Sequence, residues 1–207
     1  MMGMDIRNII YIFPAIIIVL TLHEYSHAKM SDLLGDPTPR NRGRLTLNPL
    51  AHIDPLGLLM LMLIRLGWAK PVPTSPIYYR DRKRGTLYVA LAGPASGIVL
   101  ALVVRIIIVS GLFRWTGIPV QFFTYLYFYS LVISVFNLLP VYPLDGSRIL
   151  QGLLPGNRGY KLVQYQNQIQ VVFMLIIFLA NRLLWAILNP IIGVIDFVIT
   201  TAVGLFF

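Results

Sequence analysis

Two histidines and a glutamate lie close together inside an apolar stretch near the start of the chain. His23 and His27 are four residues apart, so on a helix they share one face, about 40° apart in rotation and about 6 Å in rise. Two imidazoles in this arrangement can bind one Zn²⁺, and Glu24 can then act as a general base toward a water on the metal. Zinc lowers the pKa of such a water to about 7, and the carboxylate accepts its proton.

These residue types are scarce in the chain, which makes their grouping informative. The sequence has three histidines, and Glu24 is its only glutamate. Ionisable side chains are costly inside a membrane and usually mark a functional site there. The alternative is a polar patch that forms hydrogen bonds between helices. The grouping of all three residues within positions 23–27 favours the metal site.

The composition indicates a membrane protein. Of the 207 residues, 57% are hydrophobic and 12% are charged, whereas soluble domains average about 25% charged residues. The net charge of +9 comes from basic residues in separate loops, which argues against a nucleic-acid-binding surface. The chain has no cysteine, which excludes disulfides, thiolate zinc sites and cysteine nucleophiles.

The apolar segments predict an all-α polytopic membrane protein with about five transmembrane helices. The predicted spans are residues 8–30, 86–110, 120–140, 168–187 and 190–206. The break between the last two is indicated by Asn181, Arg182 and the Leu-Asn-Pro sequence 188–190. Residues 56–69 are too short to span and have basic residues on both flanks, so we expect a re-entrant or interfacial segment. The alternating sequence "GRLTLN" predicts a small β element near the membrane surface, and residues 141–161 are expected to form a loop.

The distribution of basic residues predicts the orientation of the protein. Residues 31–85 and 141–166 are rich in lysine and arginine, whereas the other predicted loops contain only Arg114 and Arg182. By the positive-inside rule, the first span runs toward the cytoplasm and the C-terminus also lies inside. The histidine pair therefore lies near the cytoplasmic face of a multi-pass protein in the cell membrane.

A third zinc ligand should come from another segment at the same membrane depth. The candidates are His52, Asp54, Asp145 and Asp196. Asp145 is best placed, because it directly follows the cytoplasmic end of the 120–140 span, where Pro140 and Pro143 end the helix. Gly146 would permit a tight turn that directs the carboxylate back toward the helix. A simple Asp-Gly turn without a metal is the alternative.

The sequence "HEYSH" followed by "NLLPVYPLDG" resembles the site-2 protease family of intramembrane zinc metalloproteases. Further matching pieces are "LGD" at 34–36, "GRLTLNPLAHIDPLG" at 43–57 and "AGP" at 92–94. The resemblance covers roughly residues 16–150 and is strongest to the compact prokaryotic branch without PDZ or CBS domains. It implies a single membrane-embedded domain, 1–207, with a catalytic core at about 8–150 and C-terminal helices at about 167–207.

The resemblance also implies roles for individual residues. His23, His27 and Asp145 would ligate one Zn²⁺ per chain, Glu24 would be the catalytic base, and Asn137 would bind substrate backbone or the oxyanion. The substrates would be transmembrane segments of other proteins in the lipid bilayer. Independently of the resemblance, the proline-rich stretch 36–55 and the strand candidate 45–50 predict that an extended substrate is held by strand addition.

The chain departs from the family in two places. It lacks a clear helix before the first span, and Gly97 stands where the family often has asparagine. The alternative function is a non-catalytic membrane metal-binding or metal-transport protein. A general base beside a metal ligand argues against that alternative, because neither role needs one.

Overall fold

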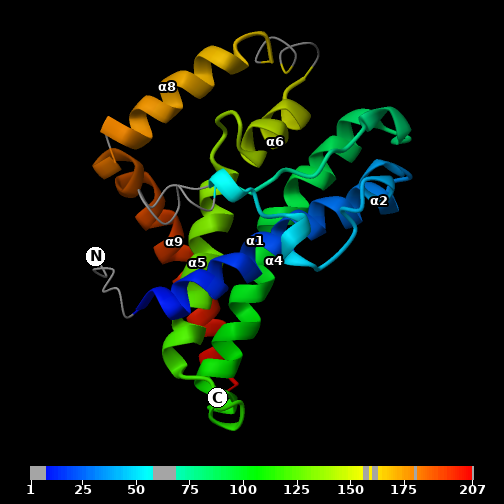
Figure 1. Cartoon of the computed structure of the whole chain (residues 1–207). Helices are drawn as coiled ribbons and strands as arrows, with labels where there is room; N and C mark the ends of the chain where they lie inside the picture. The colour runs from blue at the N-terminus through cyan, green and yellow to red at the C-terminus, as the bar shows by residue number, and fades with distance from the viewer. Residues whose placement is uncertain (1–7, 58–68, 156–158, 160–162, 180, 207) are drawn as a thin grey trace.

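The computed structural model describes residues 8–57, 69–155, 159, 163–179 and 181–206, and these are mainly helical (Figure 1). The long helices are α1 (Ile9–Leu33), α4 (Arg82–Val109), α5 (Val120–Leu138), α8 (Gln166–Leu179) and α9 (Asn181–Gly204). The short helices are α2 (Thr38–Asn41), η2 (Pro49–Ala51), η3 (Pro76–Tyr78), η4 (Leu112–Trp115) and α6 (Asp145–Leu153). Within the described residues, four helices are long and apolar enough to cross a membrane: α1, α4, α5 and residues Arg182–Gly204 of α9.

Helices α1, α4 and α5 pack together and form the core of the bundle. Their buried side chains interlock in one apolar cluster that also receives the end of α9. The cluster contains Ala15, Val19, Ala101, Val104, Phe123, Leu126, Tyr127, Leu131, Ile199 and Val203. The three predicted spans 8–30, 86–110 and 120–140 are therefore confirmed as long apolar helices.

Small residues allow α4 to approach α5 closely. A Cβ atom added to Gly97 would overlap the hydroxyl of Ser134. Ser130 and Ser134 are fully buried, and each hydroxyl donates to the carbonyl oxygen four residues earlier on α5. Close helix contacts through small residues are common in membrane proteins. At this contact the packing leaves no space for the asparagine that the family often has.

Helix α9 runs antiparallel to α5. Leu184 and Leu188, near its start, pack with Val135 near the end of α5. Val203, near its end, packs with Phe123 at the start of α5. The described C-terminal end therefore lies beside the α4–α5 connection, as Figure 1 also shows. This differs from the prediction, which placed the C-terminus at the opposite end.

The predicted division into five spans is wrong in its last part. The predicted span 168–187 is replaced by α8, which ends at Leu179 and has 14 residues. Such a helix is about 21 Å long, which is shorter than the hydrocarbon core of a bilayer. Pro190, at the predicted break, lies inside α9 instead. A helix in lipid continues through a proline because a break would expose many more unsatisfied backbone groups.

The predicted β element is also wrong within the described residues, which contain no strand. Residues 44–48 form no regular element and bend at 45–46. The side chain of Asn48 accepts a hydrogen bond from the Leu50 N–H at the start of η2. The alternation in "GRLTLN" did not produce a strand because no neighbouring strand pairs with it there. One isolated bridge joins Ile53 to Ala69. The predicted re-entrant segment falls largely on 58–68, outside the described residues.

The predicted loop 141–161 contains a helix, α6, which begins at Asp145. An acidic residue in the first turn of a helix is stabilised by the partial positive charge of the helix N-terminus. Gly146 lies against the end of α5, and a Cβ atom there would overlap the carbonyl oxygens of Leu138 and Leu139. Gly146 therefore provides a close approach between α6 and α5, rather than the tight turn expected from the sequence.

Candidate metal centre

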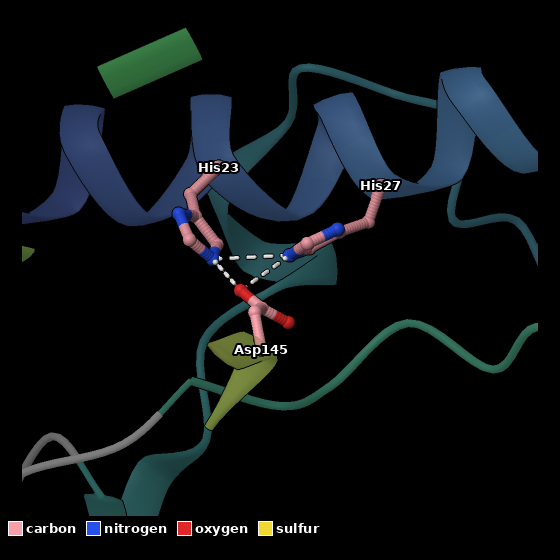
Figure 2. A group of neighbouring side chains, drawn as sticks. All are labelled: His23, His27 and Asp145. Atoms are coloured by element: carbon pink, nitrogen blue, oxygen red, sulfur yellow. Dashed lines mark hydrogen bonds and ion pairs between the residues drawn. The ribbon is translucent and has the colours of Figure 1, made fainter. Parts of the chain in front are cut away.

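Helices α1 and α6 bring His23, His27 and Asp145 together, as Figure 2 shows. The Nε2 atoms of the two histidines are 3.1 Å apart. The Oδ2 atom of Asp145 lies 3.0 Å from Nε2 of His23 and 3.1 Å from Nε2 of His27. Both imidazoles are buried, with 4% and 7% exposure. The three atoms thus form a nearly equilateral triangle.

The hydrogen bond of His27 to the backbone shows that this triangle suits a cation. Nδ1 of His27 lies 2.7 Å from the carbonyl oxygen of Val89, which can only accept, so Nδ1 carries the proton. A neutral His27 then presents a lone pair on Nε2 toward Asp145, which is also an acceptor. Zinc ligands at 2.0–2.1 Å in a tetrahedral site lie about 3.3 Å apart, close to the observed separations. The three side chains therefore fit a zinc ion.

Gly93 on α4 provides the space beside the two imidazoles. A Cβ atom at position 93 would lie 2.6 Å from Nε2 of His23 and would also overlap Nε2 of His27. Any side chain there would occupy the space toward which the ligand atoms point. The "AGP" sequence at 92–94 therefore has a physical role in this site, which is to keep that space open.

Asp145 is held in its ionised form. Burial raises the pKa of this carboxyl group, but the contacts of its Oδ2 atom with the imidazoles of His23 and His27 outweigh that effect and hold the pKa well below its usual value. An ionised carboxylate is the form that binds a metal.

A cavity of about 110 Å³ opens beside the metal group and places Glu24 near it. It is lined by His23, Glu24, His27, Pro71, Val72, Thr74, Asn137, Pro143, Asp145 and Arg148. The Oε2 atom of Glu24 accepts a hydrogen bond of 3.0 Å from the Val72 N–H. Oε1 makes no hydrogen bond with a described residue. The cavity therefore combines a group that could hold a metal ion, a carboxylate oxygen that no described residue engages, and space for a few water molecules.

Asn137 lies on the cavity wall, where α5 ends. Its Nδ2 donates one hydrogen bond of 2.9 Å to the carbonyl oxygen of Ile133, one turn earlier in the same helix. An amide has two N–H donors and one carbonyl acceptor, so one donor and the Oδ1 acceptor are left for a ligand.

The other candidate ligands have different partners. Nε2 of His52 lies 2.8 Å from the Thr46 carbonyl oxygen, and Asp54 accepts from the Gly57 N–H at 2.8 Å. Asp196 accepts a 2.6 Å hydrogen bond from the hydroxyl of Tyr127. None of these three belongs to the metal group formed by the described residues. His52 and Asp54 thus act as hydrogen-bonding loop residues.

The cavity also contains residues that the sequence did not predict. Arg148 lies three residues after Asp145 on α6, a spacing that puts both on one side of a helix. This signal was missed because residues 141–161 were expected to form a loop. Pro71, Val72 and Thr74 come from the segment before α4. Val72 contacts Glu24 through its backbone, and no side-chain pattern in the sequence indicates such a contact.

Comparison with known proteins places the chain among zinc metalloproteases. Residues 111–180 match the family described as Peptidase family M50. The chain is 33% identical over 190 residues to the "Putative zinc metalloprotease YwhC" of Bacillus subtilis, with 86% of each chain covered. It is 34% identical to the "Putative zinc metalloprotease Rip2" of Mycolicibacterium smegmatis, covering 70% of this chain and 60% of that protein.

A more distant relative comes from an archaeon. The chain is 36% identical over 93 residues to the "Zinc metalloprotease MJ0392" of Methanocaldococcus jannaschii, which covers 43% of this chain and 26% of that protein. No solved structure matches the chain. The relatives thus agree on one activity.

Proposed function

Because the chain belongs to peptidase family M50 and is an intramembrane zinc metalloprotease, we propose that its catalytic centre is the cavity between α1 and α6. In this proposal His23, His27 and Asp145 hold the zinc ion, and Glu24 is the catalytic base. The observation that carries the proposal is the convergence of the three ligand atoms beside a carboxylate that has one free oxygen. When bound, zinc supplies a Lewis acid that polarises a peptide carbonyl and makes water more acidic.

Glu24 transfers the proton in this mechanism. The Val72 N–H holds Oε2, so Oε1 is the atom that accepts a proton from the attacking water. Glu24 then returns that proton to the leaving amine as the peptide bond breaks. A carboxylate held by a backbone donor keeps one orientation through both steps, which reduces the reorganisation each step requires.

Asn137 binds the substrate in the same proposal. Its remaining Nδ2 hydrogen donates to the carbonyl oxygen of the peptide bond that is cleaved, where negative charge develops. Its position on the cavity wall supports this role. Removing a single donor of this kind from other enzymes costs about 100- to 1,000-fold in rate.

The proposed substrates are transmembrane segments of other proteins in the lipid bilayer. The cavity is lined by residues of α1 and α5, two helices that are apolar enough to span, so a substrate reaches it from within the membrane. A helical substrate hides its carbonyl groups in hydrogen bonds, so the segment must unwind locally before cleavage. We assign the whole chain, 1–207, to one protease domain, with the core at about 8–150 and the C-terminal helices at about 167–207.

A non-catalytic metal-binding or metal-transport function is not favoured. The relatives named as zinc metalloproteases argue against it. The position of Glu24 on the cavity wall also argues against it, since storage or transport of a metal needs no general base.

The test of the function is cleavage of a membrane-spanning peptide by the purified protein in lipid vesicles. Glu24→Gln should lower kcat/KM by about 100- to 10,000-fold while zinc remains bound in the same ratio to protein. Asp54→Asn is the matched control, because that carboxylate lies in a loop and contacts Gly57. Equal cleavage by wild type and Glu24→Gln would show that Glu24 is not the base.

The orientation of the site can be tested separately because the chain has no cysteine. We propose that the cavity lies near the cytoplasmic face of the cell membrane, since the basic residues gather in the loops around it. Arg42→Cys should resist a membrane-impermeant thiol reagent in intact cells. Trp115→Cys, at an exposed position at the other end of α4, should react. The reverse labelling pattern would place the site on the outer face.

A further inference from the structure

The segment from Ala69 to Ser75 crosses the cavity and contacts the proposed catalytic base. Pro71 and Pro73 have no backbone N–H, so between Lys70 and Thr74 only Val72 can donate from the main chain. That donor makes the 3.0 Å hydrogen bond to Oε2 of Glu24. The side chain of Val72 is 7% exposed, so packing also fixes this residue. The segment thus presents one backbone donor to one carboxylate.

Arg44 holds the first end of this segment. Its guanidinium group donates to the carbonyl oxygens of Ala51, Lys70 and Pro71, the last at 2.8 Å. Arg44 is buried, with 6% exposure, and its charge has no carboxylate partner among the described ion pairs. The Lys70 N–H adds a hydrogen bond of 2.8 Å to the His52 carbonyl oxygen. A buried guanidinium that binds three carbonyl groups fixes the path of the backbone directly before Val72.

Asp36 holds the second end of the segment. Its Oδ2 accepts from the Ser75 N–H at 2.7 Å and from the Ser31 hydroxyl at 2.7 Å. Its Oδ1 accepts from the Thr38 N–H at 2.9 Å, and the carboxylate is fully buried. Ser31 lies on α1, one turn after His27, so the segment is attached to the same helix that carries the histidines. The second end of the segment is therefore attached to the helix that carries Glu24, and Arg44 joins the first end to the loop that contains Ala51.

We propose that Arg44 is a positioning residue for catalysis, which holds the 69–75 segment so that the Val72 N–H orients Glu24. The proposal rests on the proposed function, because it takes Glu24 as the base. A base must lie within hydrogen-bond reach of the water it deprotonates, and small displacements of such groups lower rates strongly. A main-chain donor keeps its proton at every working pH, so it holds the carboxylate in one orientation throughout the reaction.

Arginine is required at position 44 because of the shape of its side chain. The planar guanidinium reaches carbonyl groups of Ala51 and of the 69–75 segment at once through two nitrogen atoms. Lysine carries the same charge on a single nitrogen and lacks this fixed fork of donors. Arg44→Lys should therefore recover only part of the activity that Arg44→Ala loses.

The contact with Glu24 is tested by comparing Val72→Pro with Val72→Ala. Both variants lose the valine side chain, and only Val72→Pro lacks the N–H. Because Val72 precedes Pro73, its backbone is biased toward the extended region, which includes the polyproline II conformation that proline adopts. We expect kcat of Val72→Pro to be about 100-fold below that of Val72→Ala, with similar KM and the same zinc content. Equal or higher kcat in Val72→Pro would overturn the proposal.

The role of Arg44 is tested by hydrogen exchange as well as by activity. Since prolines have no amide hydrogen, exchange in residues 71–74 reports only Val72 and Thr74. Arg44→Ala should speed this exchange by about tenfold. It should also lower kcat by a larger factor than the factor by which KM changes. Arg42→Ala is the control, because Arg42 is an exposed arginine of the same loop. Unchanged exchange and kcat in Arg44→Ala would overturn the proposal.

The outcomes separate this proposal from the proposed function. If Arg44→Ala does not fold, the pair of Val72 variants still decides whether the N–H matters. If wild type binds zinc but cleaves no membrane-spanning peptide, the proposed function fails, whatever the exchange data show. If wild type cleaves and Glu24→Gln does not, while Val72→Pro matches Val72→Ala, only the positioning role is wrong.

Discussion

Two of the polar groups among the described residues of the helix bundle are built differently. The metal group, His23, His27 and Asp145, brings acceptor atoms together beside a cavity. The second group, which we call the brace, consists of Arg105, Tyr127 and Asp196 from α4, α5 and α9. In the brace, the Tyr127 hydroxyl donates to Asp196 at 2.6 Å, and the Arg105 guanidinium lies 5.6 Å from the centre of the Tyr127 ring.

The difference lies in whether the acceptor atoms face donors. In the brace a donor meets an acceptor, and a cation lies over an aromatic ring, so the group stabilises helix contacts without a ligand. In the metal group the Nε2 atom of His27 and the Oδ2 atom of Asp145 are acceptors that face each other, and a cation would satisfy them together. Polar residues in membrane helices therefore indicate a ligand site when their acceptors converge without enough donors.

The largest expected effect comes from closing the space in the metal group. Gly93→Ala places a Cβ atom against both imidazoles, so we expect loss of zinc and a fall in cleavage of about 1,000-fold or more. Gly193→Ala is the control, since nothing lies within 4 Å of its added Cβ. Zinc content and cleavage of the purified variants measure the effect. Full zinc occupancy in Gly93→Ala would mean that the metal does not lie beside α4.

The second prediction replaces the aspartate of the metal group with asparagine. Asp145→Asn removes the anionic ligand and leaves a side chain of nearly the same shape. Zinc affinity should fall by at least about 100-fold, because zinc prefers an ionised carboxylate. Competition with a chelator of known affinity measures it. An affinity equal to that of wild type would remove Asp145 from the ligand set.

A smaller effect, on stability, is expected from a substitution at the contact between α4 and α5, which lies outside the metal group. Gly97→Ala should lower the free energy of unfolding by about 1–3 kcal/mol, because the new methyl group overlaps the Ser134 hydroxyl. Adding Ser134→Ala should restore most of that loss, since it removes the overlapping atom. Denaturant unfolding in detergent micelles gives both values. A loss that the second substitution does not relieve would place the strain elsewhere.

The smallest effect is expected in the brace. Asp196→Asn should cost about 1 kcal/mol or less of stability, because single hydrogen bonds between membrane helices contribute little. Zinc affinity and cleavage should match those of wild type. A large loss of zinc in this variant would show that the brace and the metal group act together, and the contrast between them would disappear.

The sequence predicted the parts of this molecule that depend on local spacing. The pair His23 and His27 follows from helix geometry, and three long apolar segments gave α1, α4 and α5 nearly at their observed bounds. The family assignment is confirmed by the relatives. The structure brings Asp145 to the histidines, as the proline-rich end of the 120–140 span suggested. The catalytic roles stay predictions.

The features that the sequence did not predict depend on contacts between distant residues, which the spacing of residue types along the chain does not indicate. Helix α6 was missed because glycine and proline usually indicate a loop, whereas Gly146 serves a close contact with α5. The break before α9 was misplaced because Pro190 is tolerated inside a helix where lipid cannot satisfy the backbone. Arg44 acts on Val72 through the backbone carbonyl of Pro71, far away in the sequence. Since every residue has a backbone carbonyl, no residue type in the sequence indicates this link.

The two contacts that orient the key side chains come from the main chain, namely the Val89 carbonyl for His27 and the Val72 N–H for Glu24. Main-chain hydrogen bonds of this kind remain when the side chain at the same position is replaced, as long as the backbone keeps its path. Positions 72 and 89 can therefore drift during evolution while the site keeps its geometry, except that proline at 72 is excluded. An alignment of diverged relatives would show little at these two positions, although both hold the centre in place.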